Sequence, residues 1–542
     1  MTYESIVSYM NSLEFSGMKL GIERIKAALK MFGNPEKKLK IIHITGTNGK
    51  GSVAAMTSSV LMQAGYSVGM YTSPHLVDVR ERIQVNGSKI SEEEFRDTFV
   101  DGKSKLVGLT FFELLTLMAV LHFVKKKVDY AIFEVGLGGT YDATNFDTTF
   151  MSAITKISLD HLDVLGKSVE EIARDKCGII KQGQTVVTTS ANTEVMEIIK
   201  QTAAAKKAKL VVAAPTEYPL ALKGQFQKQN AGIVVEVTRA LGVPDDVIKK
   251  GLLAAKWPGR VEYLEKNILM DSAHNPGGIT ALSEYVKTLK YSKLIIVFAV
   301  SKNKDYERML TLLPKYDALI FTQSTVVRRL PIEEIPPELE CVKIREPLEA
   351  LRHAKSMAGA KDLILVCGSI FLIGDVKRGM VEKNIEVDEK DNVLGLRPRD
   401  DFYTGKHIHR ASHLVLLNSK DEILVQKRVP TKKWYPNLYT FSVSGTVADE
   451  SYEHCMKKEM QEEIGISIPV KFIFKFPFFD KLDKAFHAIF VGKSDEEIKP
   501  DKREMTEARW IPAEDLKKDI KEHPEKYTPP FVEGMKKYFA EF

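Results

Sequence analysis

Apolar runs that alternate with segments of helical spacing characterise the first part of the chain. Polar turns or helical segments follow apolar runs at Ile41–Ile44, Ser67–Tyr71, Val128–Glu134 and Ser152–Ser158. Strands that alternate with helices in this way form parallel sheets covered on both faces. We therefore predict an α/β domain over residues 1–256, with two short helices before its first strand.

A second, smaller α/β domain is predicted for residues 257–381. The segment KWPGR (Lys256–Arg260) interrupts the first pattern. Beyond it, helical stretches separate short apolar strands at Ile268–Met270, Leu294–Val300, Ala318–Thr322 and Leu363–Cys367. This alternation again favours a sheet covered by helices.

The pattern changes once more towards the C-terminal end. Residues 382–406 are charged and poor in apolar positions, which predicts a linker. From 407 to 542 the chain predicts an α+β domain with one helix at Tyr452–Ile464 and another near Glu533–Ala540. The expected strands are His413–Leu417, Ile423–Lys427, Tyr439–Val443, Lys471–Phe476 and His487–Gly492.

The loop GTNGKGS, between the strand that ends at Ile44 and a helix at Val53–Gln63, carries the first candidate chemistry. Backbone N–H groups at a helix N-terminus attract polyphosphate, a lysine can reach its outer phosphates, and a serine hydroxyl can bind Mg²⁺. The loop differs from a standard P-loop because a glycine separates its lysine from its serine, and for this loop alone an ordinary glycine-rich turn remains the alternative. The expected nucleotide-binding residues are Gly46, Thr47, Asn48, Gly49, Lys50, Gly51 and Ser52.

Polar groups at the ends of other predicted strands extend this candidate site. Glu134 ends an apolar strand, which is where an open α/β sheet places Mg²⁺ ligands. A polar segment at Thr72–Gly87 follows another strand and is predicted to be a ligand loop. His274 lies in DSAHNPGG (Asp271–Gly278) directly after the first strand of the second domain, which indicates a site that faces the first domain.

Three acids lie within one turn of the predicted C-terminal helix. Glu459, Glu462 and Glu463 have the spacing i, i+3 and i+4, which places them on one helix face. Carboxylates this close repel one another unless solvent or cations neutralise them, so Mg²⁺ coordination is the functional interpretation. A solvated acidic helix face is the alternative, and the flanking Gly445 and Gly465 favour the metal.

Composition narrows the class of partner. A net charge of +6 over 542 residues is too small a bias to indicate nucleic-acid or membrane binding, although a small anionic ligand needs only a local patch. We expect neither a signal peptide nor a membrane span, because the sequence lacks their apolar runs. Four widely spaced cysteines fit neither a zinc site nor a disulfide framework, so we expect a cytoplasmic enzyme that acts on small molecules.

Several motifs occur together in a fixed order. They are GTNGKGS, TSPHLVDVRERIQVNG, EVGLGGTYDATN, ISLDHLDVLG, IARDKCGIIK, GQFQKQNA, WPGR, DSAHNP and CGSIFLIG. Through these motifs residues 1 to about 380 resemble folylpolyglutamate synthase/dihydrofolate synthase, a member of the Mur ligase superfamily. Thr140, Tyr141, Phe226 and Asn303 depart from the usual family residues without removing a phosphate or metal group.

This resemblance implies a Mur-ligase-type ATPase domain and a glutamate ligase domain that together act as a monomer. ATP would phosphorylate the carboxylate of a pteroate or folate with the help of Mg²⁺, and L-glutamate would attack the acyl phosphate; another pterin or cofactor acceptor is the alternative. The implied catalytic residues are Lys50, Lys176 in carbamylated form, and His274. Further nucleotide contacts would come from Asn230, Arg260 and Asp271. Substrate would meet Ser73, Pro74, His75, Arg82 and His274, and the metal ligands would be Ser52, Ser73, Glu134 and His161.

The C-terminal residues 407–542 resemble a Nudix domain through Lys458, Glu459, Glu462, Glu463, Gly465 and Ile466, although the loop before the helix is one residue short. KWYPNLYTFSVSG is also similar to relatives of isopentenyl diphosphate isomerase, but that enzyme needs a cysteine where this chain reads SVSG. A Mg²⁺-dependent hydrolase of a diphosphate-linked substrate is therefore preferred, with Glu459, Glu462 and Glu463 as catalytic metal ligands and Glu504 as a further ligand. Dihydroneopterin triphosphate is the substrate that would join both halves in folate synthesis, and a regulatory nucleotide-binding module is the alternative.

Overall fold

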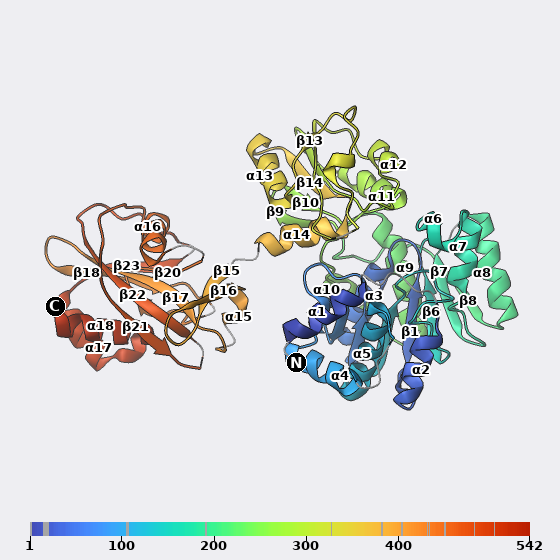
Figure 1. The fold of residues 1–542 in the computed structure, drawn as a ribbon, viewed down its shortest axis with the longest axis horizontal. Coiled ribbons are helices and arrows are strands. Elements are labelled where there is room, and N and C mark those ends of the chain that lie inside the picture. Colours follow the sequence, from blue (N-terminus) through green and yellow to red (C-terminus); the bar gives the residue numbers. More distant parts are fainter. Residues whose placement is uncertain are drawn as a thin grey trace. The chain divides into compact units, whose positions relative to one another are not determined.

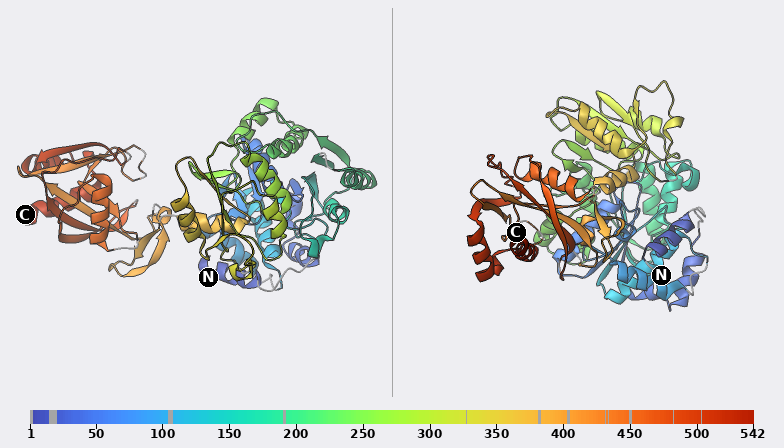
Figure 2. Two further views of the ribbon diagram at one scale, coloured as in Figure 1. Left: turned by 90° about the horizontal axis from the view of Figure 1, so that it is seen from above. Right: turned by 60° about the vertical axis from the view of Figure 1, so that its left-hand side comes forward.

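A computed structural model describes residues 3–14, 21–103, 108–189, 192–326, 328–380, 383–402, 405–430, 432, 434–448, 451–481, 483–502 and 504–542. The chain forms two compact units, Met1–Arg378 and Gly379–Phe542 (Figures 1 and 2). None of the described helices is both long enough and apolar enough to cross a membrane.

An eight-stranded sheet forms the centre of the first domain. Its strands are β1 (Ile41–Thr45), β2 (Val68–Tyr71), β3 (Ile83–Val85), β4 (Ser88–Lys89), β5 (Tyr130–Glu134), β6 (Thr149–Ile154), β7 (Thr185–Thr189) and β8 (Lys209–Ala213). They lie in the order β4-β3-β2-β5-β1-β6-β7-β8, and all pairs from β2 to β8 are parallel, whereas β3 and β4 form an antiparallel edge. The predicted parallel sheet is confirmed, and it places the carboxyl ends of β1, β2, β5 and β6 at one edge.

Helices cover both faces of this sheet. They are α1 (Tyr3–Glu14), α2 (Glu23–Met31), η1 (Pro35–Lys38), α3 (Lys50–Gln63), η2 (Val79–Arg82), α4 (Glu92–Lys103), α5 (Phe111–Lys126), α6 (Leu162–Leu165), α7 (Val169–Cys177), α8 (Thr193–Ala205), α9 (Phe226–Ala240) and α10 (Asp245–Ala254). Ile41 belongs to the core under α1, α2, α4 and α5, whereas Ile42 and Ile44 belong to the core under α3, α9 and α10. The alternation follows from the two-residue period of a strand.

The second domain has a six-stranded sheet of its own. The strands are β9 (Glu262–Glu265), β10 (Ile268–Met270), β11 (Leu294–Phe298), β12 (Ala318–Phe321), β13 (Val342–Lys343) and β14 (Leu363–Cys367), in the order β13-β12-β11-β14-β10-β9. Only β9 is antiparallel to its neighbour. The accompanying helices are α11 (Pro276–Val286), α12 (Tyr306–Thr311), η3 (Ile332–Glu334), α13 (Pro347–Met357) and α14 (Ile370–Met380).

The predicted linker is wrong for the described residues of 383–402. They form a hairpin of β15 (Lys383–Val387) and β16 (Val393–Pro398), followed by α15 (Arg399–Phe402), and they belong to the C-terminal unit. Ile385 and Val387 are buried with Val447, Cys455 and Phe486. Charge-rich composition misled the prediction because this hairpin buries only a few apolar side chains, and their burial comes from residues far along the chain. The other predicted domain limits stay predictions.

A seven-stranded sheet forms the core of the C-terminal unit. Its strands are β17 (His409–Leu417), β18 (Glu422–Arg428), β19 (Tyr439–Thr440), β20 (Val443–Thr446), β21 (Lys471–Phe479), β22 (Lys484–Lys493) and β23 (Met505–Pro512). α16 (Tyr452–Glu463) packs on one face, and α17 (Ala513–Glu522), η4 (Pro524–Lys526) and α18 (Pro529–Glu541) contribute to the core of the other. The predicted strand Tyr439–Val443 is split between β19 and β20, and the sequence prediction missed β23 and α17.

Candidate functional site

The glycine-rich loop joins β1 to α3, and neighbouring backbone fixes its shape. Thr47 donates its backbone N–H to the carbonyl of Lys156 at 2.9 Å and its hydroxyl to the carbonyl of Ser158 at 2.9 Å. α3 begins at Lys50, and its N-cap residue, Gly49, offers no side chain to accept from the first turn. The N-terminus of α3 is therefore left to a ligand that carries negative charge.

Two lysines meet at the carbonyl oxygen of Gly46. Lys50 Nζ donates to it at 3.0 Å, and Lys176 Nζ, from the end of α7, donates to it at 3.0 Å. Burial, followed by repulsion from Lys50, lowers the pKa of Lys176 to about 7, and burial also lowers the pKa of Lys50. Two ammonium groups on one carbonyl create a strong local preference for an anion.

The glycine that separates Lys50 from Ser52 has a packing reason. A Cβ atom at Gly51 would lie 2.7 Å from Cζ2 of Trp257, the residue that precedes the second domain. Ser52 accepts a hydrogen bond from Gln227 Nε2 at 3.2 Å, and Asn230 donates to Gln227 Oε1 at 2.9 Å. The loop thus packs directly against Trp257 and α9.

Glu134 lies at the end of β5, as predicted, and beside the start of the Thr72–Gly87 loop. Its Oε2 accepts from the backbone N–H of Ser73 at 3.2 Å, and a cis peptide bond follows between Ser73 and Pro74. Burial raises the pKa of Glu134, whereas Lys50 opposes this shift. A buried carboxylate beside Ser73 and Lys50 fits an Mg²⁺ site, because a divalent cation would stabilise its charged form.

Polar side chains join the two domains of the N-terminal unit. Asn48 and Asn275 exchange hydrogen bonds of 3.2 and 3.0 Å, and Asn275 Nδ2 also donates to Asp160 Oδ2 at 2.8 Å. Lys304 Nζ lies 2.5 Å from Asp160 Oδ1 and 3.4 Å from His161 Nε2. Burial, followed by the charge of Lys304, lowers the pKa of His161 to about 4, so this imidazole is neutral and able to bind a metal.

Residues of the DSAHNP segment hydrogen-bond to nearby backbone groups, in addition to the contacts that Asn275 makes between the two domains. Asp271 accepts from the backbone N–H groups of Val261 at 2.9 Å and Ala273 at 2.8 Å, and burial raises its pKa. His274 Nδ1 contacts the carbonyl of Ser272 at 2.9 Å, and burial lowers the pKa of His274 to about 3. The charge of Arg260 acts on Lys50, Glu134 and Asp271 alike, which places it at the same junction.

Two side chains of the predicted ligand loop, Arg82 and His75, contact each other. Arg82 Nε donates to His75 Nδ1 at 2.9 Å, and the guanidinium of Arg82 lies 5.1 Å from the centre of the Phe111 ring. Burial and the charge of Arg82 lower the pKa of His75 to about 3. A neutral imidazole and a guanidinium beside an aromatic ring suit a flat ligand that carries a carboxylate.

The structure brings the predicted residues of the N-terminal unit to the carboxyl ends of β1, β2, β5 and β6 and to the facing domain. The candidate site residues named from the sequence did not include Gln227, Asp160, Asn275 and Lys304. The first three lie within the motifs GQFQKQNA, ISLDHLDVLG and DSAHNP, so the motifs could have indicated them. Lys304 lies in a polar stretch after β11, and only the fold brings it to Asp160.

The acids of the C-terminal unit differ in their surroundings. Glu463 is 5% exposed and accepts from Gln426 Nε2 at 3.0 Å and from the backbone N–H of Ser444 at 3.1 Å, whereas Glu462 is exposed. Burial raises the pKa of Glu459 to about 7; burial and the charge of Glu459 raise the pKa of Glu463 to about 8. Gly445 allows Glu459 to lie against β20, because a Cβ atom there would overlap the Glu459 side chain.

Two cations that sequence reasoning missed lie beside these acids. Lys432 forms an ion pair with Glu504. Arg428, at the end of β18, is within electrostatic range of Glu463 and Glu504, and its Nε donates to the carbonyl of Trp434 at 3.2 Å. No ion pair to Arg428 is formed within the described part of the unit. Arg428 and Lys432 both lie in the polar stretch QKRVPTKKW, and their spacing there was the sequence feature that could have indicated them.

The described carboxylates of this unit do not form a ready-made metal site. Nowhere in the described ranges do three or more His, Cys, Asp or Glu side chains converge as a ready-made metal site. The raised pKa values of Glu459 and Glu463 nevertheless mark two carboxylates that a divalent cation would stabilise in charged form. The donor set therefore fits Mg²⁺, and the metal roles of Glu459, Glu462, Glu463 and Glu504 stay predictions.

Comparison with known proteins agrees with this division. Family models for the Mur ligase middle domain, the Mur ligase glutamate ligase domain and the NUDIX domain match residues 44–239, 259–370 and 407–531. Dihydrofolate synthase/folylpolyglutamate synthase of Bacillus subtilis is 31% identical over 423 residues, which cover 69% of this chain and 98% of that protein. The chain belongs to the dihydrofolate synthase/folylpolyglutamate synthase family. The solved structure of E. coli FolC in complex with DHPP and ADP has a TM-score of 0.65 and 29% identity over 70% of this chain and 98% of that chain.

A different relative matches the C-terminal part of this dihydrofolate synthase/folylpolyglutamate synthase family member. Prenyl-diphosphate phosphatase of Methanosarcina mazei is 53% identical over 160 residues, which cover 29% of this chain and 94% of that protein. This alignment is longer than the NUDIX match at residues 407–531. In the structure the β15–β16 hairpin belongs to the same compact unit as the residues of that match.

Replacing Gly51 by Ala will disturb the phosphate loop of the ligase half. The added Cβ collides with Trp257, so we expect a loss of about 1–3 kcal/mol in the free energy of unfolding, measured by urea denaturation. The double variant Gly51→Ala/Trp257→Phe, which removes the colliding ring edge, should recover part of this loss. Equal costs in both backgrounds would show that Trp257 is not the reason for the glycine.

Metal binding by the Nudix half will depend on pH. Protons on Glu459 and Glu463 compete with a cation below their pKa values of about 7 and 8, so Mg²⁺ affinity should rise between pH 6 and pH 8. Titration calorimetry in buffers of different ionisation enthalpy measures the affinity and the protons released. Glu463→Gln should bind Mg²⁺ more weakly and release fewer protons; unchanged affinity across this range contradicts the assignment.

Proposed function

We propose that the N-terminal unit is an ATP-dependent ligase that adds L-glutamate to dihydropteroate or to a (tetrahydro)folate through an acyl phosphate. The observation that carries the proposal is the pair Lys50 and Lys176 on the Gly46 carbonyl, at an uncapped helix N-terminus beside buried Glu134. The names of the matched relatives, and the ADP and DHPP in the E. coli complex, support the same reaction for this chain.

The polyphosphate would lie along the loop Gly46–Ser52, with its charge met by Lys50 and by the first turn of α3. Ser52, Ser73 and Glu134 would hold one Mg²⁺ and His161 a second. Bound Mg²⁺ would offset negative charge on the transferring phosphoryl group. Asn230, Arg260 and Asp271 lie where α9 and the second domain approach the loop, in position for the rest of the nucleotide.

The acceptor and the amine would meet between the two domains. Arg82 and His75, on the loop after β2, would hold the acceptor, with Arg82 facing a carboxylate. His274 has a depressed pKa of about 3, so it is neutral and can accept a hydrogen bond from the ammonium or amine of glutamate. That the ligase half acts as a monomer stays part of this proposal.

The modification of Lys176 also belongs to this proposal. Carbamylation requires a neutral amine, and a pKa of about 7 leaves a large neutral fraction near neutral pH. The product would replace a buried cation beside Lys50 by an anion. That change would relieve the repulsion between the two lysines and give the metals another oxygen ligand.

The ligase proposal is tested by ADP release from the full-length protein with Mg²⁺ and L-glutamate. Release should require a pterin substrate as well as glutamate, and Lys50→Ala should slow it about 10²- to 10³-fold, because the developing charge on the phosphates loses a donor. Lys287→Ala, on the exposed end of α11, is the control.

Comparing dihydropteroate, tetrahydrofolate and no pterin identifies the acceptor. ADP release that no folate-type acceptor stimulates would contradict the proposal and direct attention to another pterin or cofactor acceptor. Release that persists unchanged in Lys50→Ala would show that the loop does not carry the phosphates.

For the C-terminal unit we propose Mg²⁺-dependent hydrolysis of a prenyl diphosphate. The 53% identity to a prenyl-diphosphate phosphatase supports this substrate class. Arg428 and Lys432 lie beside the acids and would face the diphosphate, whose negative charge would draw Lys432 away from Glu504. Glu459, Glu462, Glu463 and Glu504 would hold Mg²⁺, which, when bound, would activate water and neutralise the leaving group.

Dihydroneopterin triphosphate is the second candidate substrate. The observation that favours it is the fusion itself, because removal of its diphosphate would supply the pathway that the ligase half serves. The two substrates demand different recognition: a pterin presents hydrogen-bonding edges, whereas a prenyl chain presents only apolar surface.

Measuring the hydrolysis rate of the Glu462→Gln variant distinguishes a hydrolase from a module that only binds its ligand. Glu462 is exposed, so its replacement should leave the fold intact, whereas a lost metal ligand should lower the hydrolysis rate on the order of 10²-fold. Glu453→Gln, on the same helix and paired with Lys457, is the matched control. A wild-type protein that binds these substrates without releasing phosphate or diphosphate would instead be a regulatory module.

A further inference from the structure

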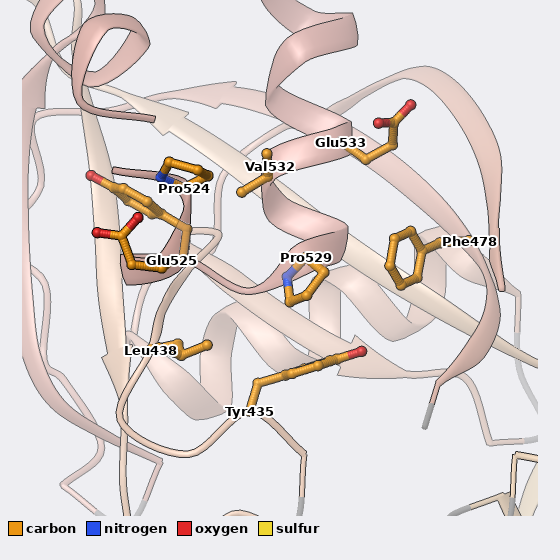
Figure 3. A pocket seen from close by; sticks show the side chains of 9 residues that line it. Tyr435, Leu438, Phe478, Pro524, Glu525, Pro529, Val532 and Glu533 are labelled. Atoms are coloured by element: carbon orange, nitrogen blue, oxygen red, sulfur yellow. The ribbon is translucent and has the colours of Figure 1, made fainter. Parts of the chain in front are cut away.

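A pocket of about 370 Å³ lies in the C-terminal unit (Figure 3). Its described walls come from three places: the loop before β19, the strand β21, and the segment from η4 into α18. The principal lining residues are Tyr435, Leu438, Phe478, Tyr527, Pro529 and Val532. This pocket lies on the face opposite α16, whose acids belong to the site already described.

The lining presents ring faces and aliphatic groups, because its hydroxyls are engaged elsewhere. Tyr435 donates its hydroxyl to Asp480 Oδ2 at 3.0 Å, and Tyr527 donates its hydroxyl to Asp519 Oδ2 at 2.6 Å. Neither Asp480 nor Asp519 lines the pocket. A ligand that depends on hydrogen-bond donors inside the pocket would therefore find none from these two tyrosines.

The charged residues that line the pocket are both acids. They are Glu525, which is exposed, and Glu533, which is half-buried. They would repel a phosphate group, so the pocket suits an uncharged part of a ligand. Because its walls are apolar and its charged residues are acidic, it suits a hydrocarbon chain better than a diphosphate.

The backbone connects this pocket to Arg428. The backbone N–H of Arg428 donates to the carbonyl of Leu438 at 3.0 Å, and Arg428 Nε donates to the carbonyl of Trp434. Tyr435 and Leu438 therefore lie on a loop whose two ends are both tied to Arg428. On the other wall, Thr528 donates its backbone N–H to the carbonyl of Tyr439 at 2.8 Å, which fixes Tyr527 beside the same loop.

We propose that this pocket binds the hydrocarbon tail of a prenyl diphosphate whose charged end lies against Arg428. The proposal rests on the hydrolase function proposed above and adds to it the subsite that selects chain length. The tail would replace water on the rings of Tyr435 and Phe478 and on Val532. Longer chains would bury more apolar surface and bind more tightly until the pocket is full.

The test compares prenyl diphosphates of five, ten, fifteen and twenty carbons with the full-length protein. Val532→Trp fills the pocket and should raise the KM of the fifteen- and twenty-carbon substrates about tenfold or more, while the KM of the five-carbon substrate and all kcat values stay near those of the wild type. Lys536→Trp, on the exposed face of α18, should change none of them. A KM change that is equal for every chain length, or absent, overturns the proposal.

Two further measurements test the proposal even if Val532→Trp fails to fold or the substrate is bound without hydrolysis. Phe478→Ala, which removes a ring from the half-buried wall, should weaken long chains selectively even if Val532→Trp fails to fold. Calorimetric binding of non-hydrolysable thiodiphosphates of the same chain lengths separates the subsite from catalysis. Chain-length-dependent binding without hydrolysis would retain the pocket and reject the hydrolase, whereas hydrolysis of dihydroneopterin triphosphate with no prenyl binding would reject the pocket.

Discussion

The carbonyl oxygen of Gly46 accepts hydrogen bonds from two buried ammonium groups, and the ligase site depends on this contact. Burying two like charges is unfavourable unless an anion neutralises them or one group loses its proton. The pKa values of Lys50 and Lys176 are both lowered, as this cost requires. The shared carbonyl and the nearby acids offset part of the cost of burying both lysines. The surrounding strands and helices hold the two lysines at this point.

The second domain contributes side chains that contact the loop Gly46–Ser52 and the residues around it. Asn48, inside the loop, exchanges hydrogen bonds with Asn275, and Asn275 and Lys304 both contact Asp160. A nucleotide bound at the loop would thus lie next to residues that also hold the domains together. Because Lys304 lies 3.4 Å from His161 Nε2, a cation arriving at His161 would compete with Lys304 for the same place. Lys304 thus joins Asp160 and His161 where the two domains meet.

The sequence was most informative where short motifs follow predicted strands. Residues Gly46–Ser52, Glu134, Lys176 and His274 were found because backbone conformation, strand ends and family motifs constrain them locally. Lys304 and Arg428 were missed because their surroundings come from distant segments: Asp160 lies beside Lys304, and Glu463 and Glu504 are within electrostatic range of Arg428. The hairpin at 383–402 was misjudged for a related reason: Ile385 and Val387 gain their burial from Val447, Cys455 and Phe486, which lie far along the chain.

The two proposed sites differ in the charges that they would present to a phosphate group. In the ligase half these are the lysines on the Gly46 carbonyl, and burial lowers the pKa of Lys176 to about 7. In the Nudix half, the proposed site contains carboxylates with raised pKa values, which would need divalent cations to hold a diphosphate. Arg428 and Lys432 lie beside these acids, and Lys432 pairs with Glu504. An apolar pocket tied to Arg428 would let such a site recognise a substrate by its uncharged end, because neither a metal nor the cations would distinguish one diphosphate from another.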